Sequence, residues 1–229
     1  MKSVNTAKTA LIIIDIQNGF FHPTYWGPSR STPDFEHNVA LLLEAARAHN
    51  KKQDECEGEG KGAGGTTNAV VVCHVHHHST EPNSPLRPGA QVEVDGRLVE
   101  GSQPQTLAQP QQHEHEPRFV KNVHSSFVGT GLEAYLRDRG VRQLVLAGLT
   151  TDHCVSTTTR FAYDLGVVSV AGPDGEIDEG DIVVAGDACA TFAKGDFDAE
   201  TVHKVHLASL KGEFAQVEKT QDILRILFG

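Results

Sequence analysis

The chain has 229 residues, 38% of them apolar, which is enough for one domain with a substantial hydrophobic core. Its formal net charge is −10, and its 20 basic residues are scattered among 30 acidic ones, which argues against a general nucleic-acid-binding surface. The uncharged runs are too short for a signal peptide or a membrane span, so we expect a cytoplasmic protein with no nucleic-acid or membrane partner.

The amino-terminal half alternates buried strands with a helix and two insertions. Residues 9–15 (TALIIID) contain a continuous apolar run rich in β-branched residues, which is typical of a fully buried parallel strand, and AVVVCHV at 69–75 predicts a second. An amphipathic helix is predicted after Asp34. Residues 51–68 are Gly-rich and charged and predict a mobile surface insertion. Residues 82–117 are proline-rich and predict an irregular excursion.

From residue 118 the alternation becomes regular. Strands are predicted at 118–121, 143–149 and 182–187, and helices at 129–140, 153–166, 198–214 and 221–228. VVSVAG at 167–172 predicts the start of a further strand, which an acidic turn interrupts. Alternating strands and helices imply right-handed crossovers. The predicted fold is therefore α/β, a single domain over residues 1–229, with a mainly parallel sheet between helices on both faces.

Three reactive side chains, Asp15, Lys121 and Cys154, come where predicted strands have just ended. Because ligands bind at the carboxyl ends of strands in open parallel sheets, we expect these residues to meet at one edge. Cys154 falls near the first turn of a predicted helix, where N–H groups and a nearby Lys121 ammonium would lower the pKa of the thiol. Asp15 is placed to accept the thiol proton and return it. Together the three favour nucleophilic catalysis, although each alone has an ordinary structural explanation.

Four further segments stand out, which are DIQNGF at 15–20, VKNVHSSFVGT at 120–130, AGLTTDHCV at 147–155 and DACAT at 187–191. In order, spacing and flanking residues they resemble the isochorismatase-like cysteine hydrolase superfamily, which includes nicotinamidases, N-carbamoylsarcosine amidases and ureidoacrylate amidohydrolases. The resemblance implies a six-stranded, three-layer αβα fold with a catalytic triad of Asp15, Lys121 and Cys154. It also implies a non-proline cis peptide between Leu149 and Thr150, with the N–H groups of Thr150 and Cys154 forming an oxyanion hole. A homodimer or homotetramer is expected, because both are usual in the resembling family.

Substrate-binding residues are predicted less directly. Phe20, Trp26 and Phe127 are candidates for the pocket wall because aromatic side chains suit a flat or heterocyclic substrate, and core or interface packing is the alternative. His76 stands where metal-binding nicotinamidases carry the Asp of an Asp-x-His motif. Alternating imidazoles at 74, 76 and 78 would share one strand face and are able to bind metal, with His77 facing the opposite way. We predict instead no metal and no cofactor, with His76 at the mouth of the site and the neighbouring histidines in solvent.

The presence of Cys154 favours one of the reactions known in the family that the chain resembles. True isochorismatases cleave a vinyl ether, and the known ones lack this residue. Cys154 therefore favours hydrolysis of a C–N bond in a small amide, ureide or carbamoyl compound through a thioester. Two alternatives stay open, which are vinyl-ether hydrolysis with Asp15 as the acid and a non-catalytic binding protein on the same fold.

Overall fold

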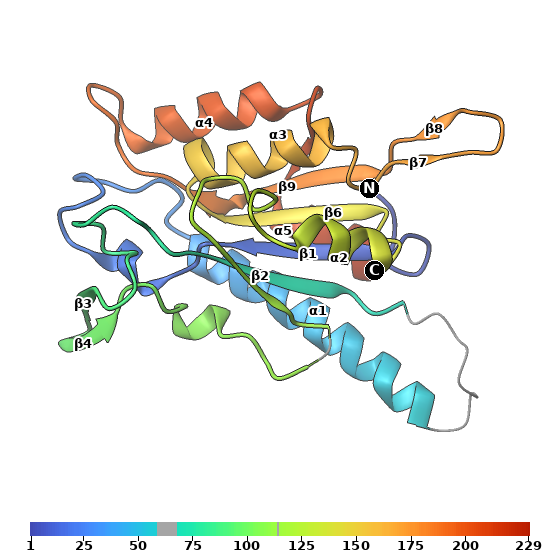
Figure 1. Cartoon of the computed structure of the whole chain (residues 1–229), viewed down its shortest axis with the longest axis horizontal. Coiled ribbons are helices and arrows are strands. Elements are labelled where there is room, and N and C mark those ends of the chain that lie inside the picture. Colours follow the sequence, from blue (N-terminus) through green and yellow to red (C-terminus); the bar gives the residue numbers. More distant parts are fainter. Residues whose placement is uncertain (59–67, 114) are drawn as a thin grey trace.

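The computed structural model describes residues 1–58, 68–113 and 115–229, and within them a six-stranded parallel sheet forms the centre (Figure 1). The strand order is β10-β9-β6-β1-β2-β5. The strands are β1 (Thr9–Ile14), β2 (Val71–His77), β5 (Arg118–Lys121), β6 (Gln143–Leu149), β9 (Asp181–Ala190) and β10 (Gln216–Glu218). Every residue of the central strands β1 and β6 is buried, as expected for a parallel sheet covered on both faces.

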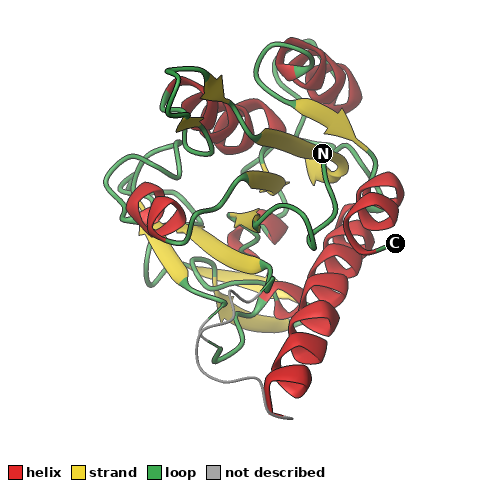
Figure 2. Cartoon of the chain, turned by 90° about the vertical axis from the view of Figure 1, so that its right-hand side faces the viewer, coloured by secondary structure: helices red, strands yellow, loops and turns green. Residues whose placement is uncertain are grey.

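Helices cover the two faces of this sheet (Figures 1 and 2). The helices are α1 (Phe35–Gly58) and α5 (Thr220–Phe228) on one face, and α2 (Leu132–Asp138), α3 (Ser156–Asp164) and α4 (Ala199–Leu210) on the other. Alternate residues of β1 serve the two layers, since Leu11 and Ile13 pack on the α1 side and Ile12 and Ile14 on the α3 side. The predicted three-layer α/β fold is confirmed. None of the described helices combines the length and the apolar character that a membrane crossing requires.

Three predicted segments differ from the structure. Residues 51–58, predicted as part of an insertion, continue α1 to Gly58, and residues 59–67 lie outside the described part of the chain. The proline-rich segment is not wholly irregular, since it contains an antiparallel hairpin of β3 (Gln91–Val94) and β4 (Arg97–Glu100) and a short helix, η2 (Thr106–Ala108). The predicted strand at 167–172 is reduced to β7 (Val170–Ala171), which pairs with β8 (Ile177–Asp178) outside the main sheet.

Candidate active site

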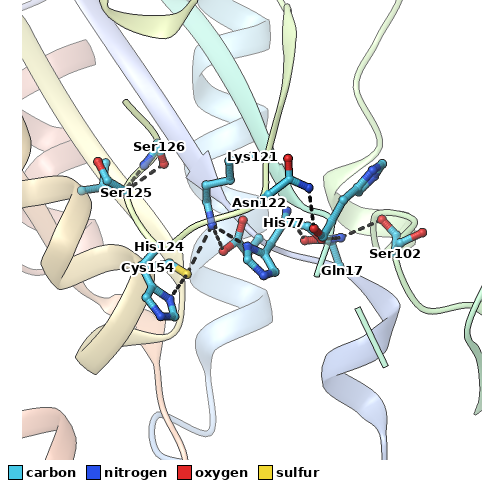
Figure 3. Close-up of polar contacts among 12 residues, drawn as sticks. Gln17, His77, Ser102, Lys121, Asn122, His124, Ser125, Ser126 and Cys154 are labelled. Carbon is cyan, nitrogen blue, oxygen red and sulfur yellow. Dashed lines mark hydrogen bonds and ion pairs between the residues drawn. The ribbon is translucent and has the colours of Figure 1, made fainter. Parts of the chain in front are cut away.

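Asp15, Lys121 and Cys154 meet at the carboxyl-terminal edge of the sheet. Lys121 Nζ donates a hydrogen bond of 2.7 Å to Asp15 Oδ2 and lies 3.3 Å from Cys154 Sγ, a contact that Figure 3 shows. The exposed fractions of the three residues are 0%, 1% and 8% in chain order. β1, β5 and β6 therefore bring the three predicted residues together, and Cys154 is the most exposed of them.

The backbone at Asp15 turns sharply as β1 ends. Its φ of 53° is in the left-handed region, which Asp tolerates better than most residues, and its N–H donates to the Val75 carbonyl at 2.8 Å. Oδ2 is held by Lys121, whereas the buried Oδ1 has no hydrogen-bond partner among the described residues. One oxygen of this carboxylate is thus fixed and the other is free to accept a proton.

The turn that carries Cys154 begins at a close contact between two strands. Gly148 has a φ of 139°, and a Cβ at this position would clash with the Ile14 carbonyl. A cis peptide bond joins Leu149 and Thr150, at the position that the resemblance implies. Cys154 then lies in a π-helical turn, η3 (Thr151–Val155), which continues into α3. Glycine is required here because β6 approaches β1 where the two strands end.

Side chains of η3 fasten this turn to neighbouring elements instead of capping the helix. Thr151 Oγ1 is 2.8 Å from Nδ1 of the buried His203 on α4. Asp152 accepts a short hydrogen bond from Thr191, next to the end of β9, and pairs with the His153 ring at 3.3 Å. No side-chain cap is formed at the start of η3 or of α3. Thr151 and Asp152 therefore anchor η3 to α4 and to the end of β9.

The charge balance of the site holds the thiol in its neutral form. Burial raises the pKa of Cys154 well above its ordinary value, the Asp15 carboxylate raises it further, and Lys121 only partly opposes them. Burial alone would lower the pKa of Lys121, but Asp15 and Cys154 outweigh burial and raise it. A thiolate beside the intact Asp15–Lys121 pair would add an uncompensated buried charge. The expectation of a depressed pKa at Cys154 is thus wrong for the free protein.

Histidines flank the reactive group on its more accessible side. Nδ1 of His77 lies 3.4 Å from Lys121 Nζ, and Nδ1 of the exposed His124 lies 3.8 Å from Cys154 Sγ (Figure 3). His76, which was predicted at the site mouth, is only 2% exposed. His76 and His77 are adjacent on β2, so their side chains point to opposite faces of the sheet. The predicted role belongs by position to His77. Strand alternation separated the two residues, but the sequence did not show which face meets the site.

The remaining histidines of β2 do not fit a metal site. His74 is buried and not in solvent, with Nε2 3.1 Å from a Glu116 oxygen that Arg47 also binds. Burial and, to a smaller extent, the nearby Arg118 guanidinium lower the pKa of His76 to about 3. A cation next to Arg118 would meet the same repulsion. Within the described residues, no group of three or more His, Cys, Asp or Glu side chains is arranged to hold a metal ion.

The three predicted aromatic residues lie in two different hydrophobic cores, one on each face of the sheet. Phe20 follows β1 in the short helix η1 (Asn18–Phe21) and stacks on Trp26 with ring centroids 4.5 Å apart. Both pack in the core on the α1 side together with Phe192. Phe127 belongs to the core that contains Cys154. Core packing thus accounts for Phe20 and Trp26, and a role of the three in binding substrate stays a prediction.

Comparisons with known proteins agree with this geometry. The Isochorismatase domain family matches residues 9–222. The uncharacterized isochorismatase family protein YrdC of Bacillus subtilis is 32% identical over 222 residues, which are 95% of each chain. The crystal structure of an isochorismatase-family protein from Chromobacterium violaceum has a TM-score of 0.72 and 33% identity, over 96% of this chain and 93% of that one. The ureidoacrylate amidohydrolase RutB of Acinetobacter baylyi is 28% identical over 182 residues, covering 73% of this chain and 69% of that protein.

The fold is a three-layer α/β fold, and Asp15, Lys121 and Cys154 meet at the carboxyl ends of its parallel strands. The chain belongs to the isochorismatase family, whose members are hydrolases.

Proposed function

We propose that this protein hydrolyses a C–N bond in a small amide, ureide or carbamoyl compound with Cys154 as the nucleophile. The observation that carries the proposal is the buried contact chain from Asp15 through Lys121 to Cys154, with distances of 2.7 and 3.3 Å. The name of the Acinetobacter baylyi relative, ureidoacrylate amidohydrolase, supports the same class of substrate.

The first half-reaction begins with a proton transfer that keeps the site's net charge constant. The Cys154 thiol gives its proton to Asp15, whose free Oδ1 is available for it. The negative charge moves from the carboxylate to Sγ, and both atoms contact the Lys121 ammonium. Sγ then attacks the carbonyl carbon, and the C–N bond breaks as Asp15 returns the proton to the leaving nitrogen. The products of this step are a free amine and a thioester on Cys154.

The second half-reaction uses the same groups. Water attacks the thioester carbon and gives a proton to Asp15, the C–S bond breaks, and the thiol regains that proton. In both halves the carbonyl oxygen becomes negative. The backbone N–H groups of Thr150 and Cys154 are proposed to stabilise it, an arrangement that removes about 3–4 kcal/mol from a barrier per donor in other enzymes.

A substrate screen with matched variants tests this proposal. Wild-type protein, Cys154→Ala and Cys189→Ala are assayed for ammonia release from primary amides, ureides and carbamoyl acids. Cys189 is the control because it is a buried free cysteine on β9 whose pKa is raised by burial to about 12. We expect turnover by the wild type and by Cys189→Ala but not by Cys154→Ala. If Cys154→Ala retained full turnover, the nucleophile assignment would be wrong.

The vinyl-ether alternative predicts a different pattern in the same set of proteins. A vinyl-ether substrate would be cleaved by Cys154→Ala as well as by the wild type, and Asp15→Asn would abolish the reaction because Asp15 would be the acid. A protein that turned over vinyl ethers in this way, and no amide, would replace the proposal.

A further inference from the structure

The Lys121 ammonium has one more contact than the proposed reaction uses. An ammonium carries three N–H donors and no acceptor. Three acceptors surround Nζ, which are Asp15 Oδ2 at 2.7 Å, Cys154 Sγ at 3.3 Å and His77 Nδ1 at 3.4 Å (Figure 3). Two of them belong to the residues that exchange a proton in the proposed mechanism, and the third belongs to His77, which that mechanism does not use.

His77 is held in place by its backbone as well as by its ring. Its N–H donates to Gln17 Oε1 at 2.8 Å, and its carbonyl accepts from Gln17 Nε2 at 3.0 Å. Gln17 is fully buried and also donates to the Ser102 carbonyl at 2.7 Å, which joins the proline-rich segment to the end of β2. The ring makes a further hydrogen bond to the Val123 backbone. The imidazole is thus a fixed group and not a mobile surface side chain.

We propose that His77 is a positioning residue of this active site, whose neutral imidazole keeps the Lys121 ammonium between Asp15 and Cys154. The inference rests on the proposed function, because that function requires Lys121 to serve both partners. Since Lys121 only donates, His77 Nδ1 must be the acceptor and the ring proton must lie on Nε2. A lysine side chain has four flexible carbon–carbon bonds, and a third fixed acceptor limits their rotation.

The surroundings of His77 favour this neutral form. Burial lowers its pKa, as do the charges of Lys121 and His124, whereas Asp15 and the Val123 hydrogen bond oppose the change. The net shift is downward, so the ring stays an acceptor to a lower pH than an ordinary histidine. Protonation would place a second cation against Lys121 and remove the acceptor. Activity that depends on His77 therefore falls when the pH drops through its lowered pKa.

Two substitutions of similar size separate positioning from a merely structural role. His77→Asn retains an acceptor oxygen close to the place of Nδ1, whereas His77→Leu has none. Hydrogen bonds to charged groups are worth about tenfold to a hundredfold in rate. We expect His77→Leu to lose kcat by that factor with KM little changed, and His77→Asn to recover most of it. His76→Leu, on the opposite face of β2, is the control and should keep wild-type kcat.

A second readout needs no substrate. Iodoacetamide labelling of Cys154, located by peptide mapping across a pH series, reports how well Lys121 stabilises the thiolate. We expect slower labelling of His77→Leu than of the wild type and His77→Asn at each pH. If His77→Leu were labelled more slowly but neither the wild type nor any variant hydrolysed an amide, the proposed function would be refuted and the role of His77 would stand. Equal labelling and kcat for His77→Leu and the wild type, or equal impairment of His77→Leu and His77→Asn, would overturn the role of His77.

Discussion

Replacing Lys121 by methionine is expected to lower the free energy of unfolding by about 3–5 kcal/mol, the range found when one partner of a buried ion pair is removed. Both side chains of the Asp15–Lys121 pair are fully buried, and their atoms are 2.7 Å apart. Methionine fills similar space but leaves the Asp15 carboxylate without its counter-charge. Adding Asp15→Asn should therefore recover part of the loss, because the stranded charge disappears.

Urea unfolding of Lys121→Met, Asp15→Asn and the double variant measures these differences, since the midpoint shifts with stability at constant slope. Lys204→Met is the control. Its pair with Glu200 spans 3.8 Å with side-chain exposures of 75% and 49%, and such surface pairs contribute less than about 1 kcal/mol. A loss from Lys121→Met no greater than that from Lys204→Met would refute the reasoning that the pair is desolvated and mutually dependent.

Three further results are expected. Gly148→Ala should lower the free energy of unfolding by more than about 1 kcal/mol, and a thermal melt should show a larger loss than for the control Gly212→Ala. Both glycines have a positive φ, but only at Gly148 would an added Cβ clash with a neighbour, the Ile14 carbonyl. Burial raises the pKa of Glu116, but the hydrogen bonds that its carboxylate accepts outweigh burial and lower the pKa from 4.5 to about 2. Ionised Glu116 therefore stabilises the folded state fully above pH 4.5, and this contribution is lost as the pH falls toward 2. Urea midpoints of Glu116→Gln should then depend less on acid pH than those of the wild type, and parallel curves would contradict this. The raised pKa of Cys154 predicts that iodoacetamide labels it faster as pH rises past 9.0, whereas a plateau near neutral pH would show a depressed pKa.

The parallel sheet and the reactive group were predictable because both depend on local signals. Residues 10–14 are apolar at every position, which only a strand covered on both faces accommodates in this fold. Asp15 and Cys154 follow the ends of β1 and β6, and Lys121 is the last residue of β5. The geometry of parallel sheets brings such positions together. The hairpin of β3 and β4 was also predictable, since Asp-Gly at 95–96 between two short strands is a strong hairpin signal.

Other features depend on tertiary contacts that the sequence does not reveal. Strand alternation separates His76 from His77, but only the placement of β5 beside β2 shows that His77 meets Lys121. The pKa of Cys154 depends on how completely the surrounding layers exclude water, and burial reverses the expected sign. Residues 51–58 have low apolar content, yet they extend a helix whose earlier turns are anchored in the core.

The central claim is that Cys154 forms a covalent thioester during hydrolysis of a C–N bond. The most direct measurement is mass spectrometry of protein quenched in acid during turnover of a substrate found in the screen, with peptide mapping of the adduct. The account predicts an adduct equal to the substrate without its amine, located on Cys154, and neither adduct nor turnover in Cys154→Ala. An adduct on another residue, or wild-type turnover by Cys154→Ala, would contradict it.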